Sequence, residues 1–96
     1  MGNILATISF IRTEDGGRNG PLPSGRIGYI LEVSGQSFSC WLLNPKGIPV
    51  EPGGAAQLEM VLAAPELALP LLKEGRRFEL KDHRKVATGI IDKILV

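Results

Sequence analysis

Residues 27–42, IGYILEVSGQSFSCWL, carry the pattern that decides the fold. Apolar side chains stand at every second position of the first half, while Glu32 falls on the other face, which is typical of a strand with one face in a core. The alternation returns in residues 37–42, and residues 33–36 supply a tight turn between the two halves. The stretch therefore predicts a β-hairpin.

In the second strand of this hairpin, the alternation predicts which side chains point inward and which point outward. Phe38, Cys40 and Leu42 share one face, which we expect to point into the core. Trp41 alternates with them beside Ser39, so we expect its ring on the outer face and partly exposed.

Four further segments have the same period of two: residues 4–11, 57–62, 77–81 and a last strand that ends in residues 89–95. In the last strand neither set of alternate positions is uniformly apolar, so we expect a bulge at Gly89. Six short strands separated by Gly and Pro turns predict an all-β barrel or sandwich, because short all-β chains must hide their strand edges.

Length and composition predict one domain over residues 1–96. With 44% apolar and 22% charged residues the chain falls in the globular range, which excludes disorder and collagen-like structure. No apolar run approaches the ~18 residues of a membrane span, and the start MGNILATISF lacks the features of a secretory signal. We therefore expect a cytoplasmic protein without a membrane partner. The single cysteine excludes an internal disulfide and agrees with a reducing compartment.

Charge is unevenly distributed along the chain. Residues 1–72 carry four basic and six acidic side chains, a balance of −2, whereas residues 73–96 carry seven basic and four acidic ones, a balance of +3. The last quarter is thus the basic end. The net charge of +1 is too near neutral to predict a non-specific nucleic-acid or membrane binder, and no DNA partner is expected.

The sequence offers weak evidence for catalysis. Residues 20–27 contain the two glycines of a phosphate-binding loop, but Arg26 and Ile27 replace the Lys and Ser/Thr that such a loop needs. Cys40 is expected to face inward, where a thiol is usually inert. His83 is the sole histidine, which leaves too few ligands for a transition metal. We therefore expect no enzyme activity, no catalytic residues, no metal site and no cofactor.

Four separated motifs point to a known family. They are EDGGR at residues 14–18, VEPG at 50–53, GRRFEL at 75–80 and VATGII at 86–91. In order and spacing, over nearly the whole chain, they resemble the C-terminal domain of elongation factor Tu. That resemblance implies a six-stranded antiparallel closed β-barrel, which agrees with the strand count. The GTP-binding domain and second barrel of the family have no counterpart here, so GTP switching is not implied.

The resemblance also implies a binding surface. In elongation factor Tu this barrel contacts the T-stem backbone of aminoacyl-tRNA, and the matching positions are Arg26, Asp82 and His83, with Arg18 in the same region. Arginine suits phosphate because its planar fork donates paired hydrogen bonds. The alternative for Arg18 is a structural role, bonding backbone carbonyls in its turn.

Three neighbouring side chains, Lys81, Arg84 and Lys85, form a basic cluster that could support RNA binding. The alternative is a solvated hairpin end that keeps a strand edge from pairing.

Residues 65–72, PELALPLL, are too apolar for an ordinary loop and lie in an insertion that the resemblance does not explain. We expect one helical turn from Pro65, followed by coil, because Pro70 prevents a regular helix. A single helical stripe cannot turn all four leucines inward. The sequence therefore predicts a partner interface formed by Leu67, Leu69, Leu71 and Leu72.

Two functions from different classes follow. The first is an RNA-binding module in translation that engages tRNA or other structured RNA through shape and phosphate contacts. The second is a protein-interaction module that uses residues 65–72 to bind a translation factor or a second copy of the chain, without RNA. A third interpretation is that the leucines close the end of the barrel.

Overall fold

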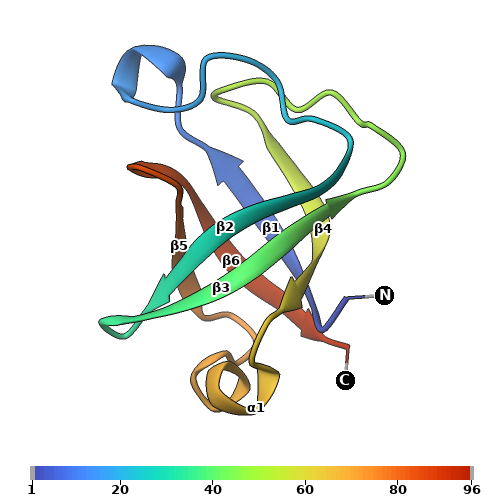
Figure 1. Cartoon of the computed structure of the whole chain (residues 1–96), viewed down its shortest axis with the longest axis vertical. Helices are drawn as coiled ribbons and strands as arrows, with labels where there is room; N and C mark the ends of the chain where they lie inside the picture. Colours follow the sequence, from blue (N-terminus) through green and yellow to red (C-terminus); the bar gives the residue numbers. More distant parts are fainter. Residues whose placement is uncertain (1, 96) are drawn as a thin grey trace.

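The computed structural model describes residues 2–95, which form one closed barrel of six antiparallel strands (Figure 1). The strands are β1 (Ile4–Phe10), β2 (Gly25–Val33), β3 (Gln36–Asn44), β4 (Ala55–Leu62), β5 (Arg77–Lys81) and β6 (Lys85–Ile94). Their order around the barrel is β1-β4-β3-β2-β5-β6, and pairing of β6 with β1 closes the ring. The all-β fold predicted from the alternation is confirmed.

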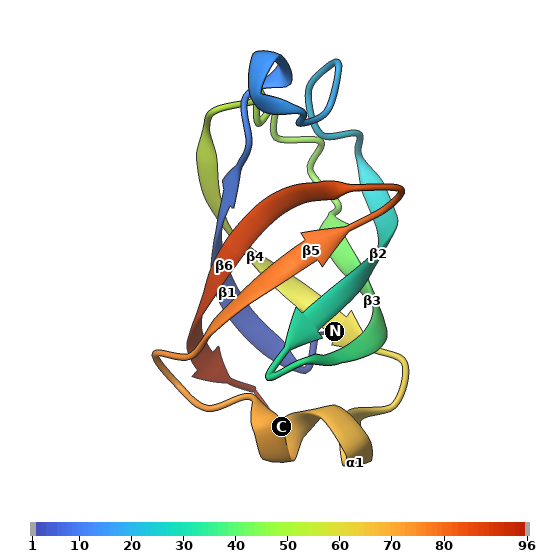
Figure 2. The same cartoon turned by 90° about the vertical axis from the view of Figure 1, so that its left-hand side faces the viewer.

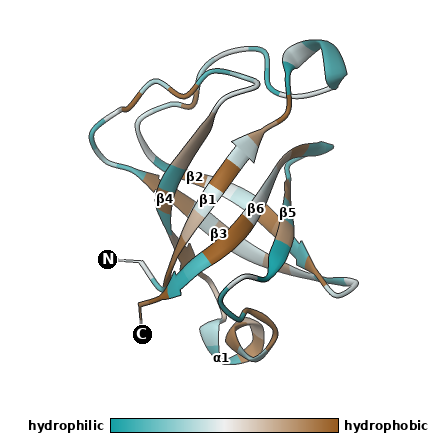
Figure 3. Ribbon diagram, turned by 180° about the vertical axis from the view of Figure 1, so that it is seen from behind, coloured by the Kyte–Doolittle hydropathy of each residue, from teal (hydrophilic) through white to brown (hydrophobic). Residues whose placement is uncertain are grey.

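The barrel interior collects the apolar positions that the period of two selects. On β1 the inward side chains Ile4, Ala6 and Ile8 are fully buried, and the other strands contribute their own alternate residues to the same core. Figure 3 shows brown apolar bands along the strands and polar colouring on the helical turn of residues 13–15. Burial of a large apolar side chain contributes about 1.5–3 kcal/mol, so this single core is the main source of stability.

The β2–β3 hairpin forms as expected. Val33 pairs with Gln36 across a two-residue turn, in which Ser34 has φ 52° and Gly35 has φ 75°. Positive φ at both turn residues is the geometry that suits the right-handed twist of the flanking strands. The turn fixes the register of the whole hairpin, which sets Trp41 opposite Gly28.

Both ends of the barrel are covered. A helical turn, α1 (Pro65–Ala68), continues into a 3-10 turn, η2 (Leu69–Leu71), and the two lie across one end of the barrel (Figure 2). The predicted helical turn is confirmed, whereas the predicted coil is wrong because Pro70 fits the start of the 3-10 turn. At the other end, Leu22 and Val50 are buried, and the amide of Leu22 donates to the carbonyl of Val50.

The predicted bulge at Gly89 is wrong. Gly89 keeps regular pairing with Phe78 on one side and Ile8 on the other. The register of β6 instead shifts at Val86 in its pairing with β5, and at Asp92 in its pairing with β1. The shift at Val86 turns two successive side chains inward, which explains why the apolar pattern of this strand is irregular.

The seam between β2 and β5 is short. Three residue pairs join the two strands, from Ile30 opposite Lys81 to Glu32 opposite Glu79. Residues 25–29 of β2 come before these pairs and do not pair with β5. The turn between β5 and β6 therefore stands beside the outer face of β2 near Gly28 and Tyr29.

Candidate nucleic-acid interface

Arg26 lies on the outer face of β2 and stacks on Trp41 of β3. Its guanidinium carbon is 4.9 Å from the centroid of the indole ring. The hairpin register produces this contact, since Arg26 pairs with Leu43 and Trp41 pairs with Gly28, so the two side chains are diagonal neighbours on one face. At an exposed site such a cation–π contact contributes about 0.5–1 kcal/mol. Arg26 has no carboxylate within ion-pair distance among residues 2–95, which leaves its donors available to an anion.

Trp41 is partly exposed, as the alternation predicts. Beside it lies a shallow hollow of ≈ 280 Å³ on the outside of the barrel. The hollow is lined by residues of β2, β3, the end of β5 and the turn that follows, among them Gly28, Ile30, Ser39, Trp41, Lys81 and Asp82. Two of the positions proposed for RNA contact, Arg26 and Asp82, therefore border the same indole ring or its adjoining hollow.

The β5–β6 turn brings Asp82 and His83 to the surface, and both residues are exposed. One carboxylate oxygen of Asp82, Oδ1, accepts hydrogen bonds from the amides of His83 and, at 3.2 Å, Arg84. The amide of Asp82 in turn donates to the carbonyl of Arg84 over 3.1 Å. Asp82 thus shapes the turn, and its other carboxylate oxygen has no hydrogen-bond donor among the described residues.

The basic cluster predicted from the sequence is largely occupied by contacts within the protein. Lys81 forms an ion pair with Glu32 at 3.1 Å, and Lys85 forms one with Glu79 at 3.1 Å. Arg84 donates to the carbonyl oxygen of Gly17 at 3.4 Å. Half-exposed pairs of this kind contribute little to stability and can open toward an anion. Among residues 2–95, neither Arg84 nor Arg26 forms an ion pair with a carboxylate, and Arg26 is the one that stacks on Trp41.

The side chain of Arg18 makes a hydrogen bond within the barrel. One of its terminal nitrogens, Nη1, donates to the hydroxyl of Tyr29 at 2.8 Å, and its Nε is buried without a hydrogen-bond acceptor in the part of the chain that the structure describes. The structural alternative given for Arg18 named backbone carbonyls as its partners, whereas the hydrogen bond in the structure goes to the side chain of Tyr29. Burial raises the pKa of that tyrosine, while the Arg18 charge acts in the opposite direction.

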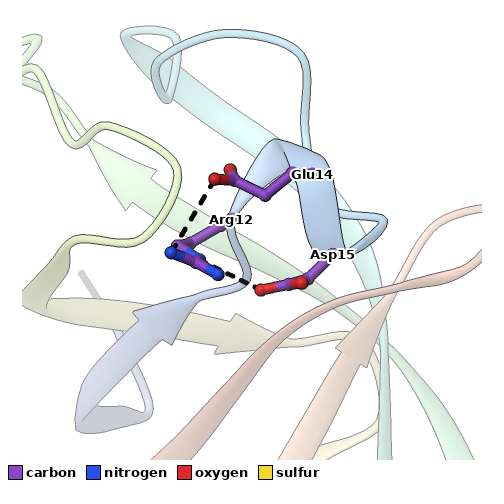
Figure 4. A network of polar contacts seen from close by, with 3 residues as sticks. All are labelled: Arg12, Glu14 and Asp15. Atoms are coloured by element: carbon purple, nitrogen blue, oxygen red, sulfur yellow. Dashed lines mark hydrogen bonds and ion pairs between the residues drawn. The ribbon is translucent and has the colours of Figure 1, made fainter.

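The loop that carries Arg18 has its own polar network (Figure 4). Arg12 Nε donates to Asp15 at 3.0 Å, and its Nη1 lies 3.7 Å from Glu14, across the 3-10 turn η1 (Thr13–Asp15). The hydrogen bond to Asp15 and the two negative charges raise the pKa of Arg12. Side chains in this network are more than half exposed, so it orients the loop without adding much stability.

The leucines of residues 65–72 occupy different environments. Leu72 is buried in the core, and Leu69 and Leu71 are partly buried against it, whereas Leu67 is 65% exposed. Leu72 is therefore not available as a surface contact, because it closes the end of the barrel. This placement leaves Leu67 as the exposed member of the candidate partner interface.

Two observations concern the groups that could take part in catalysis or metal binding. Cys40 is buried, and burial raises the pKa of its thiol to about 12, so little reactive thiolate forms near neutral pH. Among residues 2–95 no group of three or more His, Cys, Asp or Glu side chains is placed to hold a metal ion.

Sequence reasoning missed two features of this face. The stacking of Arg26 on Trp41 was implicit in the hairpin register, since a two-residue turn at Ser34 and Gly35 fixes every pair of β2 and β3. The hollow beside Gly28 depends on where the β5–β6 turn stands relative to β2. No local pattern in the sequence indicates how close this turn lies to β2.

Comparison of the chain with protein-family models and with curated proteins found no match. No helix within residues 2–95 has the length and apolar character needed to cross a membrane.

Proposed function

We propose that the protein is a non-catalytic module that binds structured RNA of the tRNA type, in a translation-related role. The observation that carries the proposal is the exposed Arg26 guanidinium stacked on Trp41 without a carboxylate partner among the described residues. The resemblance to the C-terminal domain of elongation factor Tu independently selects Arg26 as an RNA-facing position.

The chemistry of this face suits a phosphate backbone. Arginine keeps its charge at all physiological pH values and presents donors in a fork that matches phosphate oxygens. Stacking on Trp41 restricts the Arg26 side chain, so less conformational entropy is lost when it contacts a phosphate. Proteins recognise double-stranded RNA mostly by shape and backbone contacts, which require no sequence-reading side chains.

The test is RNA binding by the purified protein across a salt series. Arg26→Ala should weaken binding to a tRNA-like hairpin and reduce the slope of log affinity against log salt by about 1, because one phosphate contact is lost. Arg77→Ala is the matched control, since Arg77 is also an exposed strand arginine without an ion pair among residues 2–95, on β5. If the parent and Arg26→Ala bind RNA with equal affinity, Arg26 is not an RNA contact. If the parent does not bind RNA, the proposed function is wrong.

A second candidate function is protein interaction through the end of the barrel. The observation that favours it is Leu67, which is 65% exposed beside the partly buried Leu69 and Leu71. An exposed apolar residue on a supporting apolar surface is typical of a contact with another chain. A second copy of this chain or a translation factor would be the partner.

A further inference from the structure

Gly28 is a glycine that the fold does not require. A Cβ at this position would meet the Trp41 ring at 3.7 Å, which is an ordinary van der Waals contact. Its φ lies outside the left-handed region, unlike that of Gly25 at the start of the same strand, with φ 92°. Glycine weakens a strand interior, and where packing does not demand it, it often marks close approach by a ligand.

The missing side chain at Gly28 keeps the hollow beside Trp41 open. The hollow has the indole ring on one side and Ile30 on another, so its walls suit the flat apolar face of a planar group. Its rim is polar. Ser39 offers a hydroxyl, and Asp82 has a carboxylate oxygen, Oδ2, that accepts no bond within residues 2–95. Arg26 adds a positive charge at the ring.

A nucleotide combines the properties that this arrangement matches. Its base has two apolar faces and a hydrogen-bonding edge with amino groups, and its phosphate is an anion. Aromatic side chains bind unstacked bases by stacking, while a neighbouring arginine takes the backbone. An apolar protein side chain would use the ring and leave Arg26 and Asp82 without a complementary group.

We propose that the hollow beside Gly28 and Trp41 holds one unpaired base of the RNA, such as a bulged or terminal nucleotide, stacked against the indole. This inference rests on the proposed RNA-binding function and names its substrate class: a duplex that carries an unpaired nucleotide. Arg26 then contacts the phosphate of the extruded nucleotide or its neighbour, and Asp82 accepts a hydrogen bond from the base edge.

The experiment uses the full chain and two RNA duplexes of the same sequence, one fully paired and one with a single bulged nucleotide. Trp41 is the one tryptophan of the protein, so intrinsic fluorescence reports on this ring alone. We expect the bulged duplex to bind roughly tenfold more tightly, which is within the range for stacking one base, and to quench the emission. The paired duplex should leave the emission nearly unchanged.

Two variants test the assignment. Gly28→Val fills the hollow while keeping Trp41, and valine suits a strand, so the preference for the bulged duplex and the quenching should both disappear. Ser9→Val is the matched control, because it adds the same side chain at an exposed position of β1, which is not adjacent to β2 or β3. Thermal unfolding followed by circular dichroism verifies that both variants fold.

The outcomes separate this inference from the function on which it rests. Equal binding of the two duplexes without quenching would overturn the base site and leave RNA binding in place. Failure of the parent to bind either duplex would overturn both. Equal quenching by adenosine monophosphate at the same concentration would overturn RNA as the source of the base. A bulge preference that survives in Gly28→Val would show that the base lies elsewhere.

Discussion

The ring of Phe78 on β5 occupies the space that a side chain at Gly89 of β6 would need. The two residues are direct cross-strand partners, and a Cβ at position 89 would overlap Cζ of the ring. Phe78 is buried in the core, so the glycine is fixed by packing and not by backbone conformation. An aromatic ring over a strand glycine fills the gap that the absent side chain leaves.

Gly89→Ala should therefore destabilise the protein. The added methyl group forces Phe78 out of its position, and overpacking of a core commonly costs about 1–3 kcal/mol. Urea unfolding measures the change. Gly28→Ala is the control, because its Cβ would meet Trp41 at an ordinary 3.7 Å and its unfolding midpoint should stay near that of the parent. Similar losses in both variants would mean that the ring of Phe78 does not set the requirement.

The sequence predicts the parts of this fold that depend on near neighbours in the chain. Alternation selects the inward face of β1 and of the β2–β3 hairpin, and the turn at Ser34 and Gly35 determines the hairpin register. These features follow from side-chain direction along a strand, which has a period of two in every sheet.

Contacts between distant segments could not be predicted in this way. The sequence around Gly89 is typical of a bulge, but glycine is needed there because the ring of Phe78, on another strand, occupies the space of a side chain. The partner of Arg18 is the buried hydroxyl of Tyr29, which comes within reach when the long β1–β2 loop folds back over β2. For Leu72, composition indicates an apolar residue but does not indicate that the barrel end lies beneath it.

Asn44 is a polar residue buried in the barrel, and its replacement should lower the free energy of unfolding. Its amide nitrogen donates to the carbonyls of Pro23 at 3.1 Å and Ile48 at 3.0 Å, and its Oδ1 accepts from the amide of Ile48 at 3.0 Å. Asn44→Ala removes all three hydrogen bonds from a buried position, and each lost hydrogen bond costs about 0.5–1.5 kcal/mol. We expect a loss of at least ~2 kcal/mol in chemical unfolding. A loss below that of an exposed substitution such as Ser37→Ala would contradict this role.

Asp92 should make the free energy of unfolding depend on pH in the acid range. Hydrogen bonds from Thr7 Oγ1 at 2.6 Å and Gln57 Nε2 at 3.1 Å lower the pKa of its carboxyl group. Because the folded-state pKa lies below the unfolded value of about 3.9, the contribution is fully present above that pH and is lost as pH falls through the folded pKa. Unfolding midpoints measured from neutral pH downward should fall less steeply at the acid end in Asp92→Asn. Thr7→Val removes one donor, so its acid loss should be intermediate, and identical profiles for all three proteins would refute the assignment.

The leucines at the end of the barrel should separate into a structural and a surface group. Leu72→Ala should lower the free energy of unfolding by about 2–5 kcal/mol, because the side chain is 2% exposed and its removal leaves a cavity. Leu67 is 65% exposed, so Leu67→Ser should change stability by less than about 0.5 kcal/mol.

If this end binds a second copy of the chain, the parent should sediment as a dimer at high concentration and Leu67→Ser as a monomer of unchanged stability. Leu69→Ser and Leu71→Ser should affect both stability and association, since these residues are partly buried against the core. A parent that sediments as a monomer at every concentration would exclude self-association and leave a different partner protein or closure of the barrel as the role of this segment.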